Sequence, residues 1–224
     1  MKKIIHQIYG FIVKISKSYS RKNLYGFLDS AIKKYCRSGQ KIINIGAGGE
    51  IKKVLVNNKL DFKEIDIDKS RKPDYICSIE KMDIFEDASV DVFFVMEVLQ
   101  YVNPFNAVKE VEKKLKPGGI IIGSSPFVFP IHDEPYDFYR YTKYGLMNLF
   151  QNFEKVELVE RNSYLESAYV ILLRLVNVGT KGQIMAGVLM LPVFLLFAPF
   201  VWLFSKLVTN KQSTTGYFFI FRKR

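Results

Sequence analysis

The stretch that decides the fold is Ile42-Ile43-Asn44-Ile45-Gly46-Ala47-Gly48-Gly49-Glu50. Mostly apolar residues run into three closely spaced glycines, which is typical of a buried strand that ends in a tight turn before a helix. Glycine permits positive φ in such a turn and lets the backbone approach a ligand, because it has no Cβ. Alone the pattern is weak, since many strand-to-helix turns contain glycine.

Further apolar runs follow this strand at regular intervals. Each run is short and rich in β-branched or aromatic residues, and the connectors between the runs have helical character. This alternation predicts a Rossmann-like α/β domain, a mostly parallel sheet with helices on both faces that binds ligands beyond the carboxyl ends of its strands. The expected strands are residues 42–45, 62–65, 75–77, 90–95 and 119–123.

An acidic residue lies twenty positions after Gly46, at the end of the next predicted strand. This residue is Asp66, followed by Ile67, and a carboxylate at that point can accept hydrogen bonds from both hydroxyls of a ribose. Turn and acid together indicate a cofactor that contains adenosine. A NAD-dependent oxidoreductase is disfavoured, because a dinucleotide site needs glycine or alanine where this chain has Ile51.

Two more blocks follow in order, Asp91-Val92-Phe93-Phe94-Val95-Met96-Glu97-Val98-Leu99 and Leu115-Lys116-Pro117-Gly118-Gly119-Ile120-Ile121-Ile122. With them the sequence resembles the class I S-adenosylmethionine-dependent methyltransferases, in particular the small bacterial enzymes with a type 11 methyltransferase domain. The resemblance covers about residues 37–160 and extends to a last, antiparallel strand near the end of the chain. It implies S-adenosyl-L-methionine as the cofactor, and metal ligands are not expected.

The resemblance also implies a role for individual residues. Those expected to bind the cofactor are Gly46, Ala47 and Gly48 under its methionine part, Asn44 near its amino group, Asp66 at the ribose, Ser78 and Ile79 at the adenine, Glu97 with Val98 closing the pocket, and also Gly49 and Ile67. The chain departs from the family at Asn44, which replaces an acid, at Gly49, which comes one position early, and at Gln100-Tyr101, which replace Glu-His. A non-catalytic binding or scaffold protein that keeps the fold is therefore the alternative.

The segment from Pro130 to Thr142 resembles one that many of these enzymes carry over the substrate side. It contains His132, the candidate general base for a hydroxyl acceptor, with Asp133 beside it to orient the ring. The alternative is that the tyrosines and charged residues of this segment simply build a hydrogen-bonded loop.

Charge is distributed unevenly along the chain. Residues 1–40 carry nine Lys/Arg and one acid (+8), residues 41–160 carry sixteen and twenty (−4), and residues 161–224 carry eight and one (+7). Two basic ends around an acidic middle do not form the continuous basic stripe of a nucleic-acid-binding protein. Because both ends are also apolar, the pattern favours contact with an anionic membrane surface. Cys36 and Cys77 are predicted to be reduced thiols.

Residues 184–205 contain no charged side chain. As a helix they would extend about 33 Å, enough to cross a hydrocarbon core, although Pro192 and Pro199 interrupt the run. If the last strand rejoins the sheet, both ends of the insertion lie on one side of the bilayer. We therefore expect two short passes, a re-entrant hairpin or a surface-lying segment; the alternative is a hydrophobic hairpin packed on protein.

These observations divide the chain into four predicted parts. They are a basic amphipathic helical region (1–36), the methyltransferase domain (37–160), a hydrophobic membrane-associating insertion (161–215) and the final strand (216–224). The N-terminal apolar run is broken by His6, Gln7 and Lys14 and has no small-residue cleavage site, so no signal peptide is predicted. The expected location is the cytoplasmic face of the membrane, and the expected acceptor is a small or lipid-linked molecule. The oligomeric state stays open.

Overall fold

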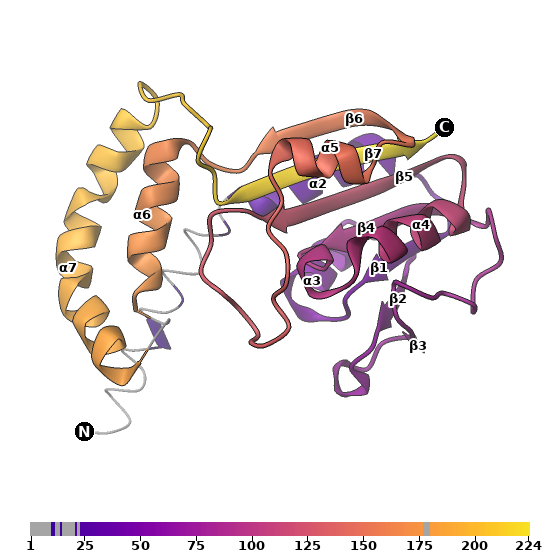
Figure 1. The fold of residues 1–224 in the computed structure, drawn as a ribbon, viewed down its shortest axis with the longest axis horizontal. Coiled ribbons are helices and arrows are strands. Elements are labelled where there is room, and N and C mark those ends of the chain that lie inside the picture. The colour runs from indigo at the N-terminus through magenta and orange to yellow at the C-terminus, as the bar shows by residue number, and fades with distance from the viewer. Residues whose placement is uncertain (1–9, 12–13, 15–20, 22, 177–179) are drawn as a thin grey trace. The chain divides into compact units, whose positions relative to one another are not determined.

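The structure is a computed structural model that describes residues 10, 11, 14, 21, 23–176 and 180–224 (Figure 1). Most of the predicted amphipathic helix near the N-terminus lies outside the described residues. The chain divides into two compact units. The first, the sheet unit, comprises residues 24–127, 132–159 and 216–224, and the second, the hairpin unit, comprises residues 1–23, 128–131 and 160–215.

The sheet unit is built on seven strands in the order β3-β2-β1-β4-β5-β7-β6 (Figure 1). The pairs β3–β2, β2–β1, β1–β4 and β4–β5 are parallel, and β5 pairs with β7 in antiparallel register. This order and the antiparallel final strand confirm the predicted Rossmann-like methyltransferase sheet. The strands are β1 (Ile42–Ile45), β2 (Lys63–Asp66), β3 (Tyr75–Ile76), β4 (Val90–Met96), β5 (Leu115–Pro126), β6 (Phe153–Glu160) and β7 (Gly216–Lys223).

Helices cover both faces of the sheet, and alternate side chains of the central strands meet them. In β4, Phe93 and Val95 belong to the core on one face, whereas Val92 and Phe94 belong to the core on the other. This alternation follows from the two-residue period of a strand, and it explains why a strand buried on both faces is apolar throughout. The first face carries α4 (Pro104–Lys114) and α5 (Lys143–Leu149), and the second carries α2 (Leu24–Tyr35) and α3 (Gly49–Asn57); two short 3₁₀ turns are η1 (Lys69–Arg71) and η2 (Leu99–Tyr101).

The last strand lies deep in the sheet. Residues 217–221 of β7 are all buried, and Ile122 of β5 lies opposite Ile220. Gly123 lies opposite Phe219, and a Cβ at Gly123 would come within 2.3 Å of the Phe219 ring. The aromatic ring therefore fills the space that a side chain at Gly123 would need.

Within the described part of the hairpin unit, helices α6 (Tyr164–Arg174) and α7 (Lys181–Phe204) lie side by side (Figure 1). Each begins with a capping box, Ser163 with Glu166 and Thr180 with Gln183. The helices pack through a small apolar cluster, and the Tyr169 hydroxyl donates to the Phe194 carbonyl oxygen at 2.8 Å. The hydrophobic helix predicted before the last strand is thus present.

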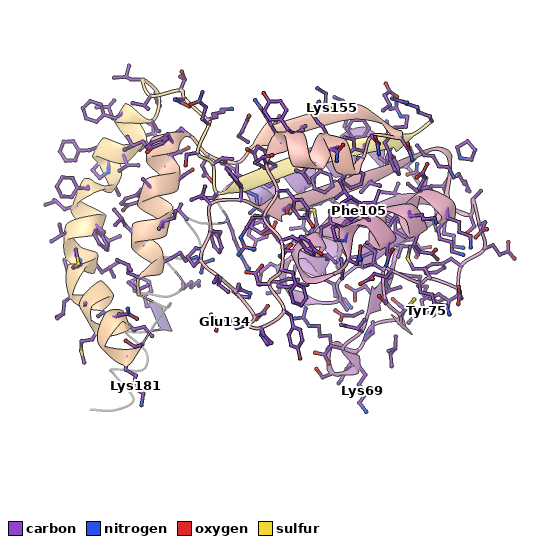
Figure 2. The ribbon with its side chains drawn as sticks, in the orientation of Figure 1. Lys69, Tyr75, Phe105, Glu134, Lys155 and Lys181 are labelled. Carbon is purple, nitrogen blue, oxygen red and sulfur yellow. The ribbon has the colours of Figure 1, made fainter. Side chains whose placement is uncertain are left out.

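Both prolines of the apolar run, Pro192 and Pro199, lie inside one continuous α7. Among the described residues, α7 is the helix that is long and apolar enough to cross a membrane, judged by length and composition. Only 17% of its most apolar 18-residue stretch is buried. Figure 2 shows aromatic side chains that project from α7 on the side away from α6. The helix therefore leaves most of its apolar surface uncovered within its own unit.

Candidate cofactor site

The glycine turn begins where β1 ends. The Gly46 backbone has φ +92° and its N–H donates to the Ile65 carbonyl oxygen at 2.9 Å, which ties the turn to β2. Gly48, at φ +79°, directly precedes α3. Both conformations are in the left-handed region, where a side chain would be strained, so the glycines are required by the path of the backbone.

Asp66 ends β2 beside this turn. Its Oδ2 accepts the Ala47 N–H at 2.8 Å, and its Oδ1 accepts the Asp68 N–H at 2.9 Å. Arg71 lies 3.8 Å from Oδ2. The Asp66 side chain is only 10% exposed, whereas Ile67 next to it is 73% exposed. The predicted ribose acid and the glycine turn are therefore joined directly, with an exposed apolar side chain alongside.

A buried polar cluster lies beneath the turn, and only part of it was predicted. Asn44 and Glu64 are register partners on β1 and β2, and they are 0% and 1% exposed. Glu64 accepts hydrogen bonds from Asn44 Nδ2 at 3.1 Å, from the Gly48 N–H at 3.0 Å and from Lys52 Nζ at 2.6 Å. Glu64 was not singled out from the sequence; it lies beside the buried Ile65 in the short strand Lys63–Asp66 and, as a buried charge, must be paired.

The loop after β4 borders the glycine turn. Glu97 has φ +58°, and its Oε1 accepts the Ser124 hydroxyl at 2.6 Å. A Cβ on Gly46 would lie 3.5 Å from Cγ2 of Val98. The strand ends of β1 and β4 thus bring Gly46, Glu97 and Val98 to one edge of the sheet, as expected for neighbouring parallel strands.

The two residues expected at the adenine have different surroundings. Ser78 Oγ accepts the Glu80 N–H at 3.1 Å, which fixes the turn after β3. Ile79 is 3% exposed and belongs to the core that α4 and α5 cover. The Ile79 side chain is therefore a core side chain, and the assignment of this pair to the adenine stays a prediction.

His132 and Asp133 lie together on the segment after β5. His132 Nδ1 is 2.7 Å from Asp133 Oδ2 and 3.1 Å from the Tyr101 hydroxyl, and both side chains of the pair are 60% exposed. A proton on Nδ1 that is donated to Asp133 leaves Nε2 as the basic nitrogen. Burial raises the pKa of Tyr101 to about 12, so its hydroxyl stays protonated near neutral pH.

The rest of this segment is held by hydrogen bonds, as the alternative interpretation expected. Asp137 accepts the His132 N–H at 2.8 Å and pairs with Arg140. The Gln100 carbonyl oxygen accepts the Phe138 N–H at 2.9 Å, and the Tyr141 hydroxyl donates to the Leu99 carbonyl oxygen at 2.9 Å. Hydrogen bonds thus hold the segment to the loop after β4, and Val98 of that loop lies beside the glycine turn. His132 can therefore belong to this hydrogen-bonded segment and also act as a general base.

A family model described as a methyltransferase domain matches residues 43–123, from β1 through most of β5. These are the residues that carry the glycine turn, Asp66 and Glu97. Residues 43–123 form a methyltransferase domain. No curated protein matches the chain.

Several solved structures share this fold at low sequence identity. They include geranyl diphosphate C-methyltransferase from Streptomyces coelicolor A3(2) in complex with Mg²⁺, geranyl diphosphate and S-adenosyl-L-homocysteine (10% identity, 88% of this chain, 76% of that chain, TM-score 0.59). Another is a putative sarcosine dimethylglycine methyltransferase from Galdieria sulphuraria (13% identity, 89% and 85%, TM-score 0.58). A third is the [4+2]-cyclase SpnF (14% identity, 89% and 80%, TM-score 0.57). At these identities the likeness concerns the fold.

Proposed function

We propose that this chain transfers a methyl group from S-adenosyl-L-methionine to a hydroxyl of a membrane-associated acceptor. The observation that carries the first half is the hydrogen-bonded pair of Asp66 and Ala47 at the carboxyl edge of a methyltransferase domain. In this assignment Gly46 to Gly49 lie under the methionine part of the cofactor, Asp66 holds the ribose, Ser78 and Ile79 border the adenine, and Glu97 with Val98 closes the site.

The residues present fit this cofactor. Asn44 Oδ1 is buried, and among the described residues it has no hydrogen-bond partner, so it is free to accept from the cofactor's ammonium. Asp66 keeps additional acceptor lone pairs for ribose hydroxyls. By contrast, Ile51 is packed against the core below α3, where a dinucleotide site needs a small residue. The site therefore favours a nucleoside cofactor without a pyrophosphate.

When bound, S-adenosyl-L-methionine supplies an electrophilic methyl group on a sulfonium. The chain's own part is to align the acceptor and to manage its proton. His132 Nε2 accepts the proton of an acceptor hydroxyl, and Asp133, which receives Nδ1–H, stabilises the imidazolium that forms. Tyr101 and Asp137 hold the ring and its backbone in place.

The membrane half of the proposal rests on α7. Its uncovered apolar side chains and the basic ends of the chain suit an anionic bilayer surface on the cytoplasmic side. Nζ of Lys206 lies 3.7 Å from the centroid of the Trp202 ring at the end of α7. Tryptophan and lysine side chains at the end of an apolar helix suit the interface between membrane and water. An acceptor that shares this location would be a small or lipid-linked molecule at the membrane.

The test is the melting temperature of the purified full chain with S-adenosylhomocysteine. A ligand that binds only the folded state stabilises it by about 2.7 kcal/mol at one hundred times its Kd. We expect S-adenosylhomocysteine to raise the melting temperature and NAD to leave it unchanged. If neither ligand raises it, the chain is a binding or scaffold protein that keeps the fold, an alternative that Asn44 in place of an acid favours. A rise with NAD alone would contradict the proposal.

A further inference from the structure

In the buried cluster beneath the glycine turn, the carboxylate belongs to Glu64 on β2, and the neighbouring residue on β1 is the uncharged Asn44. Asn44 Nδ2 donates to the Gly46 carbonyl oxygen at 3.0 Å and to Glu64 Oε1 at 3.1 Å. Both partners can only accept, so the amide group of Asn44 has a single satisfactory orientation. Its Oδ1 is buried and, among the described residues, has no hydrogen-bond partner.

Glu64 accepts hydrogen bonds from both the glycine turn and the Asn44 amide. Its Oε1 accepts the Gly48 N–H as well as the Asn44 amide, and its Oε2 accepts Lys52 Nζ. A buried carboxylate needs such donors, because an unpaired charge in the interior is costly. The hydrogen bond from Asn44 to a carboxylate also polarises the amide, which makes Oδ1 a stronger acceptor.

We propose that Glu64 is a positioning residue for S-adenosyl-L-methionine that supplies, from β2, the negative charge absent at Asn44. It fixes Gly48 in the turn and holds Asn44 so that Oδ1 accepts the α-ammonium of the cofactor. Register makes this exchange feasible, since Asn44 and Glu64 are direct neighbours on parallel strands. The inference rests on the proposed function, and it assigns Glu64 to the amino-acid end of the cofactor.

Two ligands separate this role from a general effect on folding. S-Adenosylhomocysteine carries the α-amino group, whereas 5′-methylthioadenosine has the same nucleoside and lacks the amino-acid part. For Glu64→Gln we expect calorimetry to show binding of S-adenosylhomocysteine weakened about 10- to 100-fold. Binding of 5′-methylthioadenosine is expected to stay within about threefold of the parent.

A charge swap gives a second and independent readout. Asn44→Asp alone places two carboxylates side by side in the interior, which is unfavourable. N44D/E64Q moves the single charge from β2 to β1. We therefore expect the double variant to bind S-adenosylhomocysteine more tightly than either single variant, with the affinity for 5′-methylthioadenosine nearly constant across the series.

The outcomes are distinct. A parent chain that binds neither ligand refutes the proposed function. A parent that binds S-adenosylhomocysteine, with Glu64→Gln unchanged or with both ligands weakened equally, overturns the role of Glu64. If Glu64→Gln does not unfold cooperatively, the comparison of N44D with N44D/E64Q takes its place. Tighter binding of S-adenosylhomocysteine by the double variant than by N44D supports the proposal. Tighter or equal binding by N44D overturns it.

Discussion

The backbone N–H of Ala47 donates to Oδ2 of Asp66 at 2.8 Å, so the glycine turn of β1 and the acid that ends β2 form one hydrogen-bonded unit. The acid therefore has two roles that belong to one site. It sets the position of the turn, and in the proposed function it offers its remaining lone pairs to the ribose of the cofactor.

Replacing Asp66 tests this unit. For Asp66→Ala we expect the binding of S-adenosylhomocysteine to weaken by about 2 to 5 kcal/mol, because one or two hydrogen bonds to a charged group are lost. Isothermal titration calorimetry measures the change. Asp68→Ala is the matched control, since Asp68 is half-exposed and caps η1 through the Ser70 N–H. Equal affinity of Asp66→Ala and the parent would break the ribose assignment.

The second prediction concerns His132. His132→Ala should lower methyl transfer by about 10²- to 10⁴-fold, the usual contribution of a general base, and leave the Kd of S-adenosylhomocysteine nearly unchanged. The assay is transfer of a radioactive methyl group into a detergent extract of membranes from the source organism. Glu134→Gln is the control, because Glu134 lies on the same exposed segment (Figure 2). Unchanged turnover in His132→Ala would remove this residue as the base.

The third prediction tests the packing between β5 and β7. Gly123→Ala should destabilise the sheet by about 1 to 3 kcal/mol, because the new methyl group would overlap the Phe219 ring. Gly26→Ala on α2 meets nothing within 4 Å and should stabilise by about 0.5 to 1 kcal/mol, as alanine favours helix over glycine. Far-UV circular dichroism during urea unfolding reports both changes. A Gly123→Ala chain as stable as the parent would contradict this packing.

The fourth prediction is a pH dependence. The hydrogen bond from Arg140 lowers the pKa of Asp137 below its usual range, against the opposing effect of burial. A carboxyl whose pKa is lower in the folded state stabilises the fold above its unfolded pKa of about 4 and loses this contribution as the pH falls through the folded value. Asp137→Asn should therefore lower the melting temperature at pH 7, and the deficit should shrink below about pH 4.

The control for this experiment is Asp83→Asn, because Asp83 is exposed and pairs only with exposed Lys81 in the salt bridges described. Its melting temperature should follow the parent at every pH. A deficit in Asp137→Asn that grows toward low pH would have the wrong sign and would exclude the ion pair as its source.

The fifth prediction concerns α7. The parent chain should float with vesicles of phosphatidylcholine and phosphatidylglycerol. Leu196→Glu should reduce the bound fraction, because a carboxylate placed in hydrocarbon costs about 2.5 to 3.5 kcal/mol. Leu196 is 69% exposed on the helix. Ile84→Glu, the same kind of change on an exposed apolar side chain of the sheet unit, is the control, and equal flotation of both variants would argue against insertion of α7.

The sheet was predictable because its strands obey local rules. The run from Ile42 to Gly49 contains a buried strand and its turn, and the apolar residues of β4 mark a strand covered on both faces. The final strand was predictable only through the family resemblance, since its partner β5 lies about one hundred residues earlier. The periodicity of apolar residues predicts a strand, but it does not show which other strand pairs with it.

The candidate site was predictable in part. Asp66 and the glycines follow from spacing along the chain, and the structure joins Asp66 to the glycine turn through the N–H of Ala47. Glu64 was missed because its importance depends on lateral register with Asn44, which one sequence does not reveal. The link between Tyr101 and His132 was missed for the same reason, as the two residues come from different loops that meet only after the sheet forms.

Glu160 ends β6 and Gly216 begins β7, and these two strands are neighbours in the sheet. Everything between them leaves and re-enters the domain at adjacent positions. Lengthening such a connection costs conformational entropy that grows only with the logarithm of its length. The intervening segment can therefore change in length and chemistry without a change in the core, and the same sheet can carry different segments at this one position.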